Sequence, residues 1–380
     1  MTDIHKYKLV RKAFGPSFSK SNLSLLEPII RQKAETCFKK VGRRLRDGEV
    51  VDIKTWLHFM AADTVGALCF GHDFGMLDNE TENKLVRACV DVLALAAVQS
   101  QIPLLKYISP LIASIPHPTI KWVFDSETVI FEYGAQALLD HKHELTGKDG
   151  SARPSLFSPV LNDLDNPNAK YKWDLKRLGI EAMMFIIAGT DTTGLVGAYL
   201  VWAIYRCPGV KQKLVAELES IGWTEGDRDD GVTDENLQKL PYLKAVLQEV
   251  LRLYATTQFG LPRVVPKGGR VLGQYFIPAG TECFVHAYTL HRDPNIFTDP
   301  HEFRPERWLN ATKEMESAIL TFGGGARGQH VGLAEIRLCT AMMLKYCGEA
   351  RLADSCTDES MRVVGRIIST PKGGKLELTY

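Results

Sequence analysis

The sequence predicts an α+β fold that is mainly α-helical. Apolar residues recur at helical spacing through the first half, and short strand-like runs follow after about residue 260. The composition agrees, because 380 residues with 45% hydrophobic and 24% charged side chains are typical of a globular protein with a large core. Since the chain contains no Pro-rich or Ser/Gly-rich linker and no internal repeat, we expect residues 1–380 to form a single domain.

The expected helices follow from apolar periodicity and from signals at their ends. Lys and Arg accumulate toward Arg46, where the helix dipole favours positive charge. Pro208 can occupy the first turn of another helix. The helical segments are residues 21–46, 51–70, 79–98, 175–205, 240–254 and 332–347, with one more beginning at Pro208.

The expected strands are short and lie in the second half. The residues Ile277-Pro278-Ala279-Gly280 are typical of a turn that joins two of them. Residues 291–308 show no periodicity, but their aromatic side chains favour an ordered irregular loop. The strand candidates are residues 270–276, 281–288, 361–368 and 376–380.

Residues 182–205 form an apolar run that is long enough to span a membrane, which takes about 20 residues. Asp191 near its middle would be costly in lipid. We therefore favour a helix buried in the core of a soluble protein. The formal net charge of +1 gives no basic excess for nucleic acid. The eight cysteines have irregular spacing without CxxC, so we expect reduced, scattered thiols and no disulfide framework. We assign no metal ligand.

The apolar run contains the string Ala188-Gly189-Thr190-Asp191-Thr192-Thr193. Gly189 lacks a side chain, so a flat ligand could approach the backbone there. Thr192 can bond the carbonyl of Ala188 and open the helix locally. Asp191 beside Thr192, sheltered from water, could deliver protons to a bound reactant. The alternative is a buried helix whose threonines satisfy themselves.

Two further strings are expected to meet. Glu249 and Arg252 share one helix face, and the string FRPERW ends the irregular loop with Arg307 and Trp308. Arg307 could join Glu249 and Arg252 in a partly buried triad that pins the loop to the helix. The alternative for the helix pair alone is an exposed ion pair of little energetic value.

The last string is glycine-rich and runs from Phe322 to Gly328. Gly323, Gly325 and Gly328 spell GxGxxG, which would suggest nucleotide binding after a strand. The surrounding βαβαβ pattern is missing, so we disfavour a nucleotide-binding oxidoreductase.

Taken in order, AGTDTT, ExxR, FRPERW and FGGGAR followed by a helix resemble the cytochrome P450 family. His291-Arg292-Asp293-Pro294 and the stretch from Tyr7 to Ser19 also resemble family sequences. The resemblance implies the cytochrome P450 fold, with a long central helix and small sheets, and a haem cofactor. It implies a monooxygenase that inserts one oxygen atom of O₂ into a lipophilic small molecule of specialised metabolism. The electron donor would be an NADPH-cytochrome P450 reductase.

The resemblance also assigns residues. Asp191 and Thr192 would be the catalytic proton-delivering pair, and Glu249, Arg252 and Arg307 the structural triad. Arg11, Arg263 and Arg327 would pair with the haem propionates, as guanidinium groups suit carboxylates. The expected haem contacts are Tyr7, Arg11, Ala188, Gly189, Arg263, Phe322, Gly325 and Arg327.

The chain departs from the family at the haem loop, Phe-x-x-Gly-x-Arg-x-Cys-x-Gly. Either three residues, x-Cys-x, are missing between Arg327 and Gly328, or Gln329 stands at the cysteine position. Both alignments remove the thiolate, which favours O–O cleavage by iron. Cys339 lies too far along the next helix to replace it. His330 is nearer, but capping or packing is the commoner role of such a residue.

The region that precedes Tyr7 in the family, which includes a eukaryotic membrane anchor, is also absent from this sequence. Family members typically reside at the endoplasmic reticulum membrane, and we expect this chain to be cytoplasmic or peripheral, monomeric, and incomplete at the N-terminus of its fold. We expect no activity without the cysteine. The alternative is a non-catalytic pseudoenzyme or the product of a decayed gene.

Overall fold

In the computed structural model, helices form most of the chain and the strands are short, which confirms the predicted mainly helical α+β class. The structure describes residues 4–102, 104–146, 155–164, 166–169, 171–224, 232–258, 262–323, 328–365 and 368–380.

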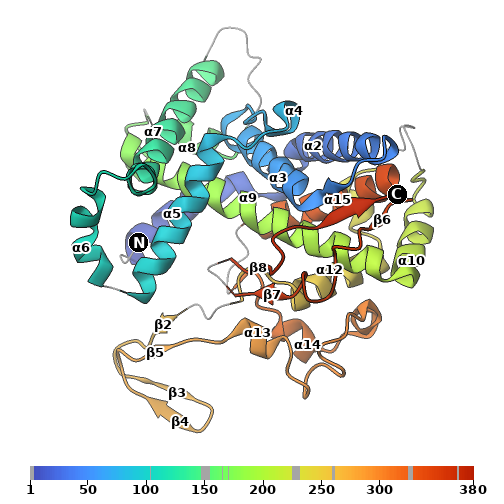
Figure 1. Cartoon of the computed structure of the whole chain (residues 1–380). Coiled ribbons are helices and arrows are strands. Elements are labelled where there is room, and N and C mark those ends of the chain that lie inside the picture. Colours follow the sequence, from blue (N-terminus) through green and yellow to red (C-terminus); the bar gives the residue numbers. More distant parts are fainter. Residues whose placement is uncertain are drawn as a thin grey trace.

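Helix α9 (Leu175–Arg206) crosses the middle of the molecule as one continuous helix, as predicted (Figure 1). Asp174 caps its first turn, where the side chain accepts a hydrogen bond from the backbone N–H of Arg177 at 2.6 Å. Cys207 ends it, and Pro208 then begins α10 (Pro208–Glu219). The most apolar window of α9 could cross a membrane by length and hydropathy, but 61% of that window is buried within the protein, as in a core helix.

The helices of the first half surround α9. α3 (Ile53–Phe70), α5 (Lys84–Gln101) and α7 (Pro118–Thr146) all pack against it. The predicted start of a helix at residue 79 is wrong, because Asn83 caps α5 by accepting a hydrogen bond from the N–H of Leu85 at 2.8 Å. The other elements of this half are α1 (Ile4–Ala13), η1 (Pro16–Phe18), α2 (Lys20–Arg46), β1 (Val51–Asp52), α4 (Met76–Asn79), α6 (Leu104–Ala113) and α8 (Ser158–Asn162).

After α11 (Asp234–Leu237) and α12 (Pro241–Leu253), the chain forms two hairpin-like strand pairs. The predicted single strand 270–276 is wrong. Gly273, with φ of 60°, and Gln274 form a two-residue turn that splits it into β3 (Arg270–Leu272) and β4 (Tyr275–Ile277). The pair extends away from the helices in Figure 1. β2 (Arg263–Val264) pairs with β5 (Glu282–Cys283), and the predicted strand 281–288 ends there, before α13 (Ala287–Leu290).

The irregular segment 291–308 is ordered, as predicted, and leads into η2 (Pro305–Asn310) and α14 (Lys313–Ala318). Helix α15 (Gln329–Cys347) begins earlier than the predicted residue 332 and packs against α2 and α9. The remaining strands are β6 (Arg351–Leu352), β7 (Val363–Val364), β8 (Thr370–Pro371) and β9 (Glu377–Thr379).

A three-stranded sheet, ordered β1-β9-β6, pairs a strand between α2 and α3 with two strands from the C-terminal part of the chain. Val51 lies opposite Leu378, and the N–H of Ile53 donates to the carbonyl of Leu376 at 2.8 Å. Asp52 accepts a hydrogen bond from the N–H of Leu376, 324 residues away in sequence. The first turn of α3 is therefore held by residues from the far end of the chain.

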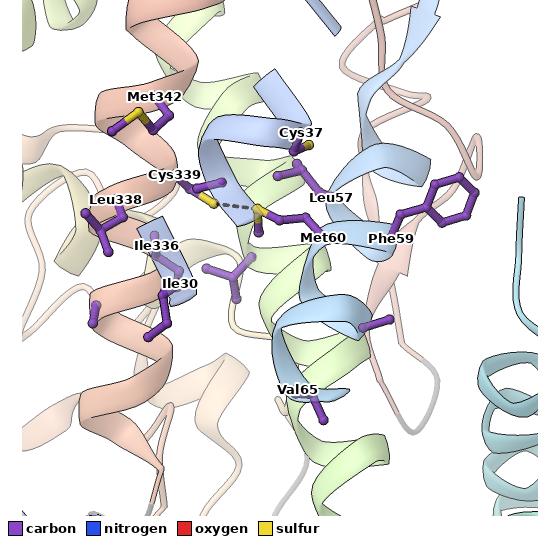
Figure 2. Packing of buried hydrophobic residues seen from close by; sticks show 14 of the residues in the cluster. Ile30, Cys37, Leu57, Phe59, Met60, Val65, Ile336, Leu338, Cys339 and Met342 are labelled. Carbon is purple, nitrogen blue, oxygen red and sulfur yellow. Dashed lines mark hydrogen bonds between the residues drawn. The ribbon is translucent and has the colours of Figure 1, made fainter. Parts of the chain in front are cut away.

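The hydrophobic core lies where α2, α3, α9, α12 and α15 meet. Figure 2 shows α15 against α3, with Cys339 directed at Met60; the two sulfur atoms are 3.2 Å apart. In a smaller cluster, Phe297 packs with Met315 and Ala318 of α14. The core therefore clamps α9 between helices from both halves of the chain.

Candidate functional site

The predicted acid on α9 faces a neighbouring helix. Oδ1 of Asp191 lies 3.2 Å from Nδ1 of His58 on α3, and 19% and 21% of the two side chains are exposed. Nothing in the sequence links His58 to Asp191, so this partner was missed by sequence reasoning. The acid therefore has a titratable partner in the structure.

The predicted hydroxyl has a different partner. Oγ1 of Thr192 donates to the backbone carbonyl of Ala188 at 2.6 Å, the expected local bond within the helix. Thr190 is buried, and its hydroxyl has no hydrogen-bond partner among the described residues. Ala188 is exposed. The proton-delivery roles of Asp191 and Thr192 stay predictions.

Gly189 allows α3 and α9 to approach closely. A Cβ atom built on Gly189 would lie 2.1 Å from Cγ2 of Val65. The open side of this glycine is therefore filled by α3, and helix packing explains the residue better than the approach of a flat ligand. The haem contact predicted for Gly189 stays a prediction of the resemblance.

The predicted triad is present and buried. Arg252 donates to both carboxylate oxygens of Glu249 at 2.8 Å, and Nε of Arg307 donates to Oε1 of Glu249 at 3.1 Å. Exposed fractions of the side chains are 0% for Glu249 and Arg252 and 7% for Arg307. Trp308 adds an indole N–H at 2.8 Å to Oε2 of Glu249. The triad prediction is confirmed.

The rest of the Arg252 guanidinium holds the irregular segment. Nη1 donates to the carbonyls of His291 at 2.7 Å and Pro300 at 2.6 Å, and Nη2 donates to that of Glu302 at 3.1 Å. Its carbon lies 4.9 Å from the centre of the Phe297 ring, within cation–π range. One buried arginine therefore donates hydrogen bonds to three backbone carbonyls that no helix or strand would pair.

His291 extends this network toward the glycine-rich string. Its Nδ1 donates to the carbonyl of Arg252 at 2.9 Å, and its Nε2 accepts from the N–H of Leu320 at 3.0 Å. These two bonds fix the tautomer, and burial lowers the pKa of His291 to about 4. The hydroxyl of Thr321 also donates to the carbonyl of Leu251 at 2.9 Å. The residues just before the glycine-rich string are thus hydrogen-bonded to α12, Thr321 directly and Leu320 through His291.

The glycine-rich string is described at its two ends. Phe322 is half-buried against the core, and Gly323 and Gly328 have φ of 62° and 78°, a conformation that favours glycine. Gly325 and Arg327, both predicted haem contacts, lie outside the described residues. Gln329 begins α15, and His330 is exposed in its first turn.

The sequence around this string, from Phe322 to Leu338, contains no cysteine. Cys339 is buried in the core, and desolvation raises the pKa of its thiol well above the ordinary value. The other seven are all described: Cys37, Cys69, Cys89 and Cys347 are buried, and Cys207, Cys283 and Cys356 are partly buried. Across the described part of the chain, no cluster of three or more His, Cys, Asp or Glu could hold a metal ion.

The expected haem therefore fits the structure in part only. Its predicted contacts Tyr7, 45% exposed, and Arg11, exposed, lie on α1, and Arg263 is exposed on β2. Arg263 donates to the carbonyl of Pro262 at 3.0 Å. These contacts stay predictions. The donor set required at the iron, a thiolate next to the glycine-rich string, does not fit, because the sequence from Phe322 to Leu338 contains no cysteine.

Comparison with known proteins covers nearly the whole sequence. The family model for cytochrome P450 matches residues 1–377. The cytochrome P450 monooxygenase tazI of Aspergillus terreus is 30% identical over 375 residues, 97% of this chain and 74% of the relative. The monooxygenase orf2 of Aspergillus niger is 30% identical over 98% of this chain and 74% of its own length. The monooxygenase aflV of Aspergillus parasiticus is 31% identical over 94% and 70%.

Proposed function

Because the chain belongs to the cytochrome P450 family, we propose that it derives from a monooxygenase of lipophilic small molecules and is inactive with its present haem loop. Family membership implies a haem, a small-molecule substrate and a reductase partner in general terms. The similar proteins named above are fungal monooxygenases, which supports our proposal of a substrate from specialised metabolism. The identity of that substrate is not part of the proposal.

The observation that carries the proposal is the placement of every thiol. A haem-thiolate enzyme needs one cysteine at the end of the glycine-rich string, and the sequence between Arg327 and Gln329 offers only Gly328. Cys339, the next cysteine along the chain, has its sulfur 3.2 Å from that of Met60 inside the core. Moving it to an iron atom would require α15 to unwind.

The non-catalytic alternative shares this observation, and binding of a lipophile without turnover would favour it. The nucleotide-binding alternative has less support. All strand pairs within the described residues are antiparallel, so the βαβ unit that presents GxGxxG to a dinucleotide is missing there.

A carbon monoxide difference spectrum of the reduced, haem-supplemented chain tests the proposal. We expect no thiolate-type band, with either a band typical of haem bound through other ligands or no bound haem. A thiolate-type band from the unaltered chain would overturn the proposal. The same samples, supplied with a reductase, should then show no product formation.

A further inference from the structure

The hairpin of β3 and β4 leaves four large apolar side chains open to solvent. The exposed fractions of Val271, Leu272, Tyr275 and Phe276 lie between 49% and 65%. The hairpin extends away from the helices (Figure 1), and no third strand pairs with it in the part of the chain that the structure describes. Because two strands alone are marginally stable in water, this hairpin offers strand edges and apolar faces on which a partner can dock.

The register of the hairpin determines which backbone groups point outward. Leu272 and Tyr275 flank the two-residue turn, and Val271 lies opposite Phe276 in the next pair. The pair that closes such a turn is hydrogen-bonded, and hydrogen-bonded and non-hydrogen-bonded pairs alternate along antiparallel strands. The N–H and C=O groups of Val271 and Phe276 therefore point away from the hairpin, those of Val271 at the β3 edge and those of Phe276 at the β4 edge.

The two edges differ in charge. The residues from Gln274 to Gly280, which include β4, contain no charged side chain, whereas β3 begins with Arg270. If two copies paired along β3 around Val271, both Arg270 side chains would lie on one face about 8 Å apart, within the Debye length of about 10 Å at 0.1 M salt. Pairing along β4 would instead place the two arginines on the outer strands, about 16 Å apart. The β4 edge is therefore the one that suits a second copy.

We propose that this protein forms a twofold symmetric dimer in which β4 of one copy pairs antiparallel with β4 of a second copy. The axis passes beside Phe276, whose N–H and C=O exchange hydrogen bonds with the same groups of the second copy. Tyr275 then faces Ile277 of the second copy, an aromatic–aliphatic pair. The four strands so joined exceed the number that a stable sheet needs. This dimer differs from the monomer expected from the sequence.

The position of the Phe276 ring favours this contact, and Pro278 limits it. A Cβ atom built on Gly269 would lie 2.3 Å from Cζ of Phe276, so the ring already lies over the backbone of that glycine. Less side-chain freedom is then lost on association. Pro278 has no N–H and ends the edge, so the pairing is short and belongs to the weak interfaces that bury less than about 1,200 Å². We therefore expect a dimer that dissociates on dilution.

Sedimentation velocity of the purified full chain tests the dimer. Over a roughly hundredfold range of loading concentration, the average sedimentation coefficient should rise from that of a monomer toward that of a dimer. A chain that stays monomeric over this range would overturn the proposal. Assemblies that grow beyond a dimer would also overturn it, because a twofold contact through one edge closes on itself.

Two lysine substitutions distinguish the two edges. Phe276→Lys places like charges opposite each other at the twofold axis and should raise the dissociation constant by at least about tenfold. Val271→Lys is the matched control, because it adds the same charge to the same face of the hairpin but on the outer strand. It should leave the dissociation constant within roughly twofold of the unaltered value. A dimer lost in Val271→Lys and kept in Phe276→Lys would assign the contact to β3 and contradict the proposal.

A mixing experiment separates a lost contact from a lost fold. Phe276→Glu alone should also be monomeric, and its equimolar mixture with Phe276→Lys should dimerise again, because opposite charges then face each other. A mixture that stays monomeric, although thermal unfolding shows both variants to be folded, would rule out the twofold pairing. If either variant fails to fold, the unaltered chain and Val271→Lys still decide the question.

Flotation with vesicles of phosphatidylcholine and phosphatidylserine tests another occupant of the hairpin. We expect the dimeric chain to remain in solution. A chain that is monomeric in solution but floats with the vesicles would assign the hairpin to a membrane surface and overturn the proposal. None of these measurements needs haem or turnover, so their outcome is independent of the proposed function.

Discussion

The N–H of Leu320 donates to Nε2 of His291 at 3.0 Å, so a neutral imidazole joins the segment before the glycine-rich string to α12. The other ring nitrogen donates to the carbonyl of Arg252. A protonated ring would lose the bond from Leu320, because Nε2 would become a donor. The hydrogen bond from Leu320 therefore requires a neutral His291 side chain.

This condition predicts a loss of stability in acid. The pKa of His291 falls from about 6.5 in the unfolded chain to about 4 in the folded protein, through burial. The unfolded chain then binds more protons between these values, so the free energy of unfolding decreases as pH falls from 6.5 to 4, by roughly 2–3 kcal/mol. Urea unfolding at pH 7 and pH 4.5 measures it. His291→Gln should reduce the slope and His117→Gln should not; equal slopes in all three proteins would contradict the assignment.

For Glu335 on α15 we predict the opposite dependence of stability on pH. It is 2% exposed, Oε1 has no partner among the described residues, and burial raises the pKa of its carboxyl to about 8. The folded protein then holds a proton that the unfolded chain has released, so stability is lost as pH rises from about 4.5 through 8.

Glu335→Gln removes this titration. It should make the protein more stable than the unaltered chain at pH 9, by on the order of 2–4 kcal/mol, with a much smaller difference at pH 5. Thermal unfolding at the two pH values measures the effect. A difference independent of pH would show that the carboxyl is ionised in the fold.

For the triad, we predict that the loss of stability depends on which buried charges a substitution leaves unpaired. Arg252→Met leaves Glu249 buried without its main partner and should lower the free energy of unfolding by about 3–5 kcal/mol. Adding Glu249→Leu should recover part of this loss, because no buried charge is left unpaired. Arg304→Met, which removes ion pairs from a side chain that is 43% exposed, should cost far less than Arg252→Met. Equal losses for Arg252→Met and Arg304→Met would contradict the burial of the triad.

The contact of Gly189 with Val65 predicts a repairable clash. Gly189→Ala should destabilise the protein by roughly 1–3 kcal/mol through overpacking, and Val65→Ala in the same chain should make that substitution milder. Gly332→Ala is the matched control, because Gly332 is also helical and a Cβ there would meet nothing within 4 Å. It should stabilise by about 0.4–1 kcal/mol. Additive effects of Gly189→Ala and Val65→Ala in urea unfolding would argue against the contact.

The proposed loss of the iron ligand predicts what restores it. Three residues with a central cysteine, inserted between Arg327 and Gly328, should return a thiolate-type band to the carbon monoxide difference spectrum. Gln329→Cys should do less, because Gln329 is the first residue of α15 and the loop stays short. The matching insertion with a central serine is the control. A band from Gln329→Cys and none from the cysteine insertion would place the gap elsewhere.

Local signals predicted much of the helical fold. The spacing of apolar residues gives α9 and Pro208 marks the start of α10, whereas the Asn83 cap at the start of α5 was missed. The triad followed from two strings that match a known family in order. The hairpin of β3 and β4 was missed because apolar residues on both sides of Gly273 and Gln274 were predicted as one strand, although Gly at this position, with its φ of 60°, suits a two-residue turn.

The site was less predictable because its contacts join distant segments. The AGTDTT string identifies Asp191 but carries no information on which helix will lie beside it, and so His58 was missed. The same holds for Gly189, because the sequence does not indicate that Val65 of α3 packs against it. His291 was seen only as part of a family string, since its bonds to Arg252 and Leu320 depend on the path of an irregular loop.

The pairing of β1 with β9 has a consequence for biosynthesis. Val51 is translated long before Leu378, its partner in the sheet. During elongation the strand edge of β1 and the first turn of α3 therefore lack the bonds that Leu376 supplies. A nascent chain released before Leu376 would keep these groups open to chaperones and proteases, so a stop codon ahead of Leu376 should sharply reduce the amount of folded protein.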